Sequence, residues 1–161
     1  MRLLGIDLGG RRIGLAVADL ETRHVRPLAT LRRGRFEEDV ERIDRLVAEQ
    51  RIETVVVGLP LNADGSAGEQ ALLTRAWAEA LAATSRTPVI LRDEYGTSEG
   101  AEARLGRARR GRQGGPPTPG ARARRRALVD RTAAVVLLEE ELRARDAGRP
   151  GLPIPPLGGA A

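Results

Sequence analysis

The sequence contains no cysteine and no lysine, and its single histidine is His24. The absence of cysteine excludes disulfide bonds, thiolate zinc sites and cysteine nucleophiles. One imidazole cannot build a histidine-rich metal site, and it argues against a serine–histidine triad. The groups that remain for catalysis are carboxylates, hydroxyls and arginines.

Aromatic residues and long apolar runs are also scarce. The only aromatic residues are Phe36, Trp77 and Tyr95, so we expect no extended platform on which nucleic-acid bases could stack. No stretch approaches the ~20 apolar residues of a transmembrane helix, and the N-terminal residues lack the shape of a cleavable signal peptide. We therefore expect a soluble, cytoplasmic protein that does not contact a membrane.

The positive charge is concentrated in one segment. All 27 basic residues are arginine, and nine of them lie in residues 104–126, which contain no Asp or Glu. The remaining 18 arginines (27 less 9) are outnumbered by the 22 acids, so the net charge of +5 is local. Such a field favours a polyanionic partner such as nucleic acid. An arginine-biased solvated surface, encoded by a GC-rich genome, would explain the missing lysine but not the clustering.

With 161 residues, 41% of them hydrophobic, the chain can bury one ordinary core. We predict a single domain over residues 1–147, in which residues 104–126 form a flexible, arginine-rich segment. The tail, 148–161, has four prolines and four glycines in fourteen residues, and we expect it to be disordered.

Hydrophobic periodicity predicts the order β-β-β-α-β-α-β-α-α. The expected strands are 2–8, 11–19, 25–32, 52–59 and 88–93. The expected helices cover residues 36–50, 97–108 and 124–146. A further helix follows a capping box at Ser66 and Glu69 and ends near residue 83. We expect a flexible loop over residues 111–120. The order predicts an α/β protein with a mixed five-stranded sheet and helices on both faces.

Asp7 lies between Ile6 and Leu8 in an otherwise apolar strand, where a carboxylate needs a partner. That partner is either Arg11 or Arg12 in an ion pair, or a divalent metal ion. Three further acids stand at comparable places, at the end of a strand or on the last helix: Asp93, Glu94 and Asp130.

The small residues Ala133 and Ala134 follow Asp130 at helical spacing and would let that face of the helix lie close to the sheet, beside Asp7. Alternatively, Asp130 stabilises the helix N-terminus. Three carboxylates from distant segments are what Mg²⁺ or Mn²⁺ requires for phosphodiester hydrolysis, since these ions prefer oxygen ligands.

Four segments of the chain, in order, resemble the motifs of the YqgF (RuvX) family, the pre-16S ribosomal RNA nucleases also described as Holliday-junction-resolvase-like proteins. Residues 7–16 are similar to its D-x-G-x-x-R-x-G-x-A signature, and residues 58–66 to G-L-P-x-x-x-D-G-[ST]. Residues 93–98 resemble D-E-R-x-[ST]-[ST], and residues 130–134 resemble D-x-x-A-A. The resemblance implies a ribonuclease-H-like fold.

The resemblance also implies that Asp7 and Asp130 bind metal together with one acid of the 93–94 pair. Adjacent strand residues point to opposite faces, so only one acid can join the site easily; we favour Glu94, with Asp93 as the alternative. The family's arginine is Tyr95 here, so another arginine must take its place, such as Arg92 or one from residues 104–126. The candidate nucleic-acid-binding residues are Arg11, Arg107, Arg109, Arg110, Arg112 and Asn62. Alternatively, Asn62 has only a structural role in the turn between a strand and a helix.

These observations predict a metal-dependent nuclease that uses Mg²⁺ or Mn²⁺ as cofactor. The resemblance implies cleavage of RNA, in maturation of the 5′ end of pre-16S ribosomal RNA. The alternatives are a DNA junction resolvase, which would need a two-fold dimer, and a non-catalytic nucleic-acid-binding module. Residues 5–10 also resemble the start of actin-like sugar kinases, but those need two such domains. The expected partner is nucleic acid, with RNA favoured and DNA possible, and the protein is expected to be a monomer or a homodimer.

Overall fold

The computed structural model describes residues 1–94, 103–106 and 116–155, and for Glu94 it describes the backbone only. Most of the helix predicted over 97–108 and half of the loop predicted over 111–120 lie outside these ranges. The same is true of four candidate nucleic-acid-binding residues, Arg107, Arg109, Arg110 and Arg112.

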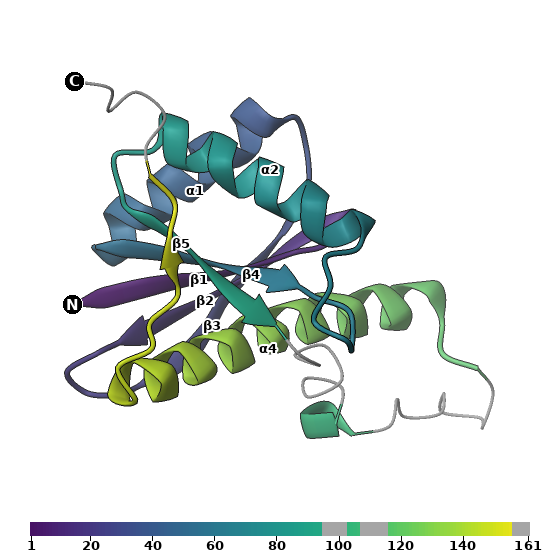
Figure 1. Ribbon diagram of the computed structural model, residues 1–161. Helices are drawn as coiled ribbons and strands as arrows, with labels where there is room; N and C mark the ends of the chain where they lie inside the picture. Colours follow the sequence, from purple (N-terminus) through teal and green to yellow (C-terminus); the bar gives the residue numbers. More distant parts are fainter. Residues whose placement is uncertain (95–102, 107–115, 156–161) are drawn as a thin grey trace.

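A mixed sheet of six strands forms the centre of the molecule (Figure 1). Its strands in chain order are β1 (Arg2–Leu8), β2 (Arg12–Asp19), β3 (Val25–Arg32), β4 (Thr54–Pro60), β5 (Val89–Glu94) and β6 (Leu152–Pro153). The order across the sheet is β3-β2-β1-β4-β5-β6. β4 pairs in parallel with β1 and β5, and all other neighbours are antiparallel. The C-terminal ends of β1, β4 and β5 therefore lie at one edge of the sheet.

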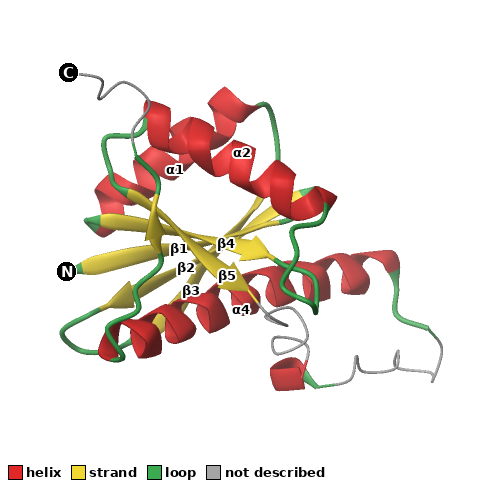
Figure 2. Ribbon diagram, in the orientation of Figure 1, coloured by secondary structure: helices red, strands yellow, loops and turns green. Residues whose placement is uncertain are grey.

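Helices cover both faces of this sheet, as predicted (Figure 2). Helices α1 (Phe36–Gln50) and α2 (Glu69–Thr84) lie on one face, and the long helix α4 (Pro119–Asp146) lies on the other. None of the helices in the described ranges combines the length and the hydropathy of a membrane-spanning segment.

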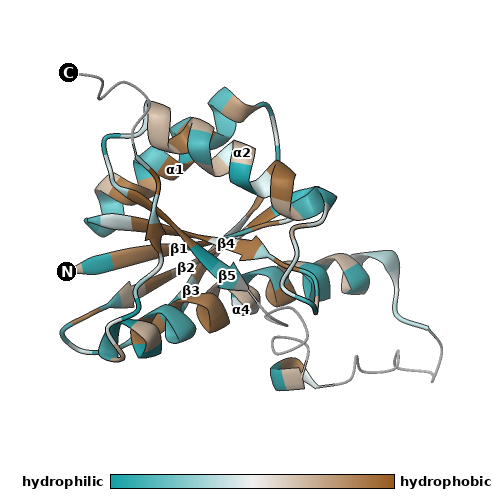
Figure 3. Ribbon diagram, in the orientation of Figure 1, coloured by the Kyte–Doolittle hydropathy of each residue, from teal (hydrophilic) through white to brown (hydrophobic). Residues whose placement is uncertain are grey.

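Two apolar clusters, one on each face of the sheet, form the core. Leu4, Ile6 and Leu8 of β1 pack with residues of α1 and α2, whereas Leu3 packs with Leu138 and its neighbours on α4. Side chains therefore alternate between the faces along β1, with period two. The central strands are mostly brown in Figure 3, and the helices carry both colours, as one-sided burial requires.

The starts of two helices differ from the prediction. Helix α2 begins after Gly68 without a side-chain cap, because the Ser66 hydroxyl donates instead to Asp64, at 2.6 Å; the predicted capping box was wrong. Helix α4 begins at Pro119 and not at residue 124, because the Thr118 hydroxyl accepts the Ala121 N–H at 3.2 Å and proline is compatible with the first helical turn.

The sheet has six strands and not five because part of the predicted disordered tail pairs with β5. The buried carboxylate of Glu141 accepts the N–H of Gly151 at 3.0 and 3.2 Å. A Cβ at position 151 would lie 2.7 Å from the carbonyl oxygen of Leu91. Glycine thus lets the chain pass directly beside β5, so disorder was wrong for residues 152–153; residues 156–161 lie outside the described ranges.

Candidate nuclease site

Asp7 is the penultimate residue of β1, and the alternation of that strand places it on the face covered by α4. Its neighbours Ile6 and Leu8 belong to the cluster on the opposite face. Asp7 is paired in register with Gly14 of β2. The carboxylate is therefore presented to helix α4 and not to the apolar layer beneath α1 and α2.

Two strand glycines allow α4 to lie directly on the sheet at this point. A Cβ at Gly14 would lie 2.0 Å from the carbonyl oxygen of Asp130, and a Cβ at Gly5 would lie 3.0 Å from that of Ala134. Ala134 is fully buried at the contact, as its small size predicted. Because Gly14 is the register partner of Asp7, the same close approach brings Asp130 next to Asp7. A glycine inside a strand pattern is a signal for such an approach, and this signal was not among those considered above.

The proximity of the two acids changes the ionisation of Asp7. Burial, followed by the charge of Asp130, raises the pKa of Asp7 from 3.8 to about 6. Desolvation and a like charge both disfavour the carboxylate form. A cation held between the two acids would reverse both effects, so this pair fits a divalent metal ion.

An arginine positions the second acid. The Arg12 Nε donates to Asp130 Oδ2 at 2.5 Å, and both side chains are partly exposed, at 31% and 20%. Among the described residues, Asp7 forms no such ion pair, so the alternative in which Arg11 or Arg12 neutralises it was wrong. Asp130 stands three turns inside α4, so it cannot stabilise that helix's N-terminus.

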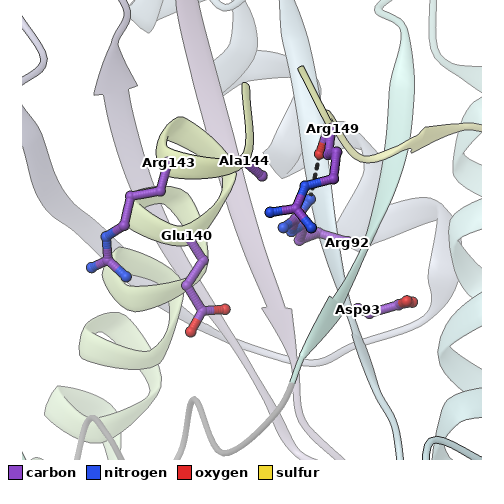
Figure 4. A pocket seen from close by; sticks show the side chains of 6 residues that line it. All are labelled: Arg92, Asp93, Glu140, Arg143, Ala144 and Arg149. Carbon is purple, nitrogen blue, oxygen red and sulfur yellow. Dashed lines mark hydrogen bonds between the residues drawn. The ribbon is translucent and has the colours of Figure 1, made fainter. Parts of the chain in front are cut away.

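Asp93 lies on the other side of β5. It is exposed, and Figure 4 shows it pointing away from α4, the helix that carries Glu140 and Arg143. The preceding residue, Arg92, faces α4 and donates to the carbonyl oxygen of Arg149 at 2.9 Å. Asp93 is therefore not brought to Asp7 and Asp130. The backbone of Glu94 pairs with Pro60 at the end of β5.

Arg92 and Asp93 border an open hollow of about 440 Å³ beside the C-terminal half of α4. Arg143 and Arg149 contribute further positive charge, but Glu140 also lines the hollow, and burial raises the pKa of Glu140 above its ordinary value. This hollow has mixed charge. In the described residues, no three His, Cys, Asp or Glu side chains form a group that could hold a metal ion, and the side chain of Glu94 is not among them.

Asn62 lies in the turn between β4 and α2. Its side-chain amide donates to the Ser66 hydroxyl at 3.0 Å, and its backbone N–H donates to the carbonyl oxygen of Ser66 at 2.9 Å. Asp64 accepts hydrogen bonds from Ser66 that close the turn, and these bonds lower the pKa of Asp64. The side-chain amide of Asn62 would have to leave Ser66 before it could contact a phosphate.

Arg11 lies in the turn between β1 and β2, at the same edge of the sheet as Asp7. It lines a hollow of about 500 Å³ together with Gly10, Arg32, Arg33 and Gly34. Arg11 was a candidate from the sequence, but Arg32 and Arg33 were not, because they lie 21 and 22 residues further along the chain. Only the pairing of β2 with β3 brings them together.

The arginine-rich segment is described in two parts, of which one contacts α4 and the other forms its first turns. Arg104 pairs with Glu139 at 2.5 Å, which raises the pKa of the guanidinium. Arg122, Arg124 and Arg126 are exposed on the first turns of α4. This half of the segment is helical from residue 119 onward.

Comparison with known proteins identifies relatives along nearly the whole chain. The model of the family described as "RuvX: Holliday junction resolvase" matches residues 1–144. A protein of Anaeromyxobacter sp. (strain Fw109-5), named "Putative pre-16S rRNA nuclease", is 44% identical over 91% of this chain and 100% of its own length. A protein of the same name from Chloroflexus aggregans is 39% identical, over 89% of this chain and 94% of its own.

Solved structures show the same fold at low sequence identity. T. thermophilus RuvC in complex with a Holliday junction substrate has a TM-score of 0.54 and 20% identity, over 95% of this chain and 99% of its own. Fowlpox virus resolvase in complex with Holliday junction DNA has a TM-score of 0.52 and 12% identity, over 90% of this chain and 99% of its own. The fold is therefore that of the ribonuclease-H-like resolvases, as predicted.

Proposed function

Because the chain belongs to the RuvX family, we propose that it is a metal-dependent nuclease that hydrolyses phosphodiester bonds, with Asp7 and Asp130 at its catalytic centre. The observation that carries this proposal is the meeting of these two carboxylates beneath α4, which Gly14 makes possible. Arg12 neutralises Asp130, but Asp7 has no such partner among the described residues, so ionised Asp7 is unfavourable in this partly buried place unless a cation binds there.

Glu94 is the proposed third acid. Position 94 is four residues after Ile90 on β5, so the two positions share a face of the strand. Ile90 belongs to the cluster beneath α4, whereas Asp93 points to the other side. Strand alternation thus favours Glu94 over Asp93. β5 and β1 run in the same direction with only β4 between them, so position 94 lies at the same sheet edge as Asp7.

Asp7, Asp130 and Glu94 would hold Mg²⁺ or Mn²⁺, and the bound ion would supply activation of water and stabilisation of the leaving oxygen of a phosphodiester. The protein's own contribution is to fix the ligands. β1 holds Asp7 rigidly, and Arg12 orients the Asp130 carboxylate through its hydrogen bond. The packing of α4 against Gly5 and Gly14 sets the distance between the two acids.

RNA is the proposed substrate, because relatives that are 44% and 39% identical carry the name "Putative pre-16S rRNA nuclease". Processing of ribosomal RNA would place the protein in the cytoplasm. The second candidate is a four-way DNA junction, which the description of the family model favours. Paired cleavage of a junction requires a two-fold dimer, so the oligomeric state separates the two candidates.

The test is a cleavage assay on three substrates with Mg²⁺, Mn²⁺ or EDTA. The substrates are an RNA that contains the 5′ boundary of mature 16S ribosomal RNA, a single-stranded DNA and a four-way junction. We expect cleavage of the RNA, and its loss in Asp7→Asn but not in Asp44→Asn, a control that removes an exposed carboxylate from α1. Junction cleavage by a dimer without RNA cleavage would select the second candidate. Binding without any cleavage would indicate a non-catalytic module.

A further inference from the structure

The hollow between the β1–β2 turn and the end of β3 is lined by three arginines, Arg11, Arg32 and Arg33, and by two glycines. No acidic side chain lines it, in contrast to the hollow that contains Glu140. In the described part of the chain, Arg11 and Arg32 form no ion pair. Two of the arginines that line one hollow therefore have no carboxylate among the described residues to neutralise them.

The backbone around the hollow is held firmly in place. The Arg33 N–H donates to the carbonyl oxygen of Arg11 at 2.9 Å, and the Arg33 guanidinium donates to that of Gly9, also at 2.9 Å. The Arg42 guanidinium donates to the carbonyl oxygen of Arg32 at 2.9 Å. The two chain segments that carry Arg11 and Arg32 are therefore joined, so little of the hollow has to be ordered when a ligand binds.

The acids nearest to the hollow are already engaged with other groups. Asp39 is buried and accepts the Gly34 N–H at 3.0 Å, and Glu38 pairs with Arg35 at 3.1 Å. Both belong to the first turn of α1 behind Gly34. The lining that faces solvent remains cationic.

The hollow is adjacent to the proposed catalytic centre. Asp7, Gly14 and Thr30 stand side by side in one row across β1, β2 and β3, and α4 crosses this row, where the Thr30 hydroxyl donates to the carbonyl oxygen of Ala127 at 2.6 Å. Arg32 is two residues beyond Thr30 on β3, about 7 Å at the rise of a strand. The hollow thus continues the same sheet edge, beyond the carboxylates.

From this arrangement we infer that the hollow binds a backbone phosphate of the substrate strand, a few nucleotides or fewer from the phosphate that is cleaved. The inference rests on the proposed nuclease function and adds a second contact to it. Planar guanidinium groups donate paired hydrogen bonds to phosphate oxygens, and such contacts position a strand without reading its sequence. The scissile phosphate would lie against the carboxylates, and the neighbouring phosphate against Arg11 and Arg32.

The test compares Arg11→Gln/Arg32→Gln with Arg86→Gln, which removes an exposed arginine before β5, at the opposite edge of the sheet. Binding of a short single-stranded RNA is measured over a range of salt concentrations, in an Asp7→Asn background that prevents cleavage. We expect affinity to fall on the order of tenfold in the double variant. The log–log salt slope should decrease by about 0.7, which corresponds to one phosphate on a single strand. Arg86→Gln should change neither quantity.

A second measurement locates the phosphate. The probe is a DNA strand with the sequence of the RNA, in which one phosphate at a time is replaced by a neutral methylphosphonate. One position near the cleavage site should weaken binding when the arginines are present and have no effect in the double variant. Thermal unfolding of the double variant should match that of the control, because exposed arginines contribute little to stability.

The outcomes distinguish a failure of the phosphate subsite from a failure of the proposed nuclease function. If the double variant binds with the affinity and salt slope of Arg86→Gln while the wild-type protein cleaves RNA, the phosphate subsite is refuted and the nuclease function stands. If the wild-type protein neither binds nor cleaves any nucleic acid, the proposed function fails and the subsite fails with it.

Discussion

Replacing Asp7 with asparagine should stabilise the metal-free protein while it abolishes cleavage. Burial and the charge of Asp130 raise the pKa of Asp7 from 3.8 to about 6. The folded state therefore binds a proton more tightly than the unfolded state, and ionising Asp7 at neutral pH destabilises the fold. A shift of roughly two pKa units at 1.36 kcal/mol per unit amounts to about 3 kcal/mol. Asparagine retains the shape of the side chain and removes this penalty.

The stabilisation should depend on pH with a defined sign. Below pH 4, Asp7 is protonated in both the folded and the unfolded wild-type protein, so the variant gains little. Between pH 4 and 6 only the folded state holds the proton, and the wild-type protein loses stability as the pH rises. Above pH 6 the difference between variant and wild type should be complete, at about 3 kcal/mol.

Denaturant unfolding in EDTA, measured from pH 3.5 to pH 8, provides the assay. Asp44→Asn is the control, because it removes an exposed carboxylate from α1 and should show no comparable pH-dependent gain. Adding Mg²⁺ should stabilise the wild-type protein more than Asp7→Asn, because the ion binds the folded pair of acids. An Asp7→Asn protein that is less stable than wild type at pH 7.5 would show that ionised Asp7 does not destabilise the fold.

Three further predictions concern packing, metal choice and charge. Gly14→Ala should destabilise the protein by about 3 kcal/mol and abolish cleavage, because the added Cβ would meet the Asp130 carbonyl oxygen at 2.0 Å. Gly10→Ala, with nothing within 4 Å of the added Cβ, is the matched control for the unfolding assay. EDTA should abolish cleavage and Mn²⁺ should restore it, whereas Ca²⁺ should support binding without turnover because its coordination is longer and looser; cleavage that survives chelation would contradict the metal mechanism. Replacing the four arginines of residues 107–112 with glutamine should flatten the salt slope of RNA binding by about 2 to 4 units, and an unchanged slope would show that these charges are only solvated.

The sheet and its helical layers were predictable because each element has a strong local pattern. β4 is a continuous β-branched run, and α1 carries apolar residues at helical spacing. Asp7 stood out for the same reason, as one charge inside an apolar strand.

The parts that were not predictable depend on contacts between distant segments. Ser66 had the spacing of a helix cap, but its hydroxyl is used by Asp64, and no local rule distinguishes these partners. The pairing of the tail with β5 depends on the buried Glu141, ten residues before Gly151. Arg32 and Arg33 join Arg11 only through the register of β3 on β2.

Asp7 and Asp130 together form the proposed site for a divalent cation, and calorimetric titration with Mn²⁺ measures binding at this site. The wild-type protein should bind Mn²⁺, and Asp7→Asn and Asp130→Asn should each bind it much more weakly, with Asp7→Asn shown to be folded by its raised stability. Asp44→Asn should bind like the wild type. Equal Mn²⁺ affinity in all four proteins would show that these two carboxylates do not bind the ion.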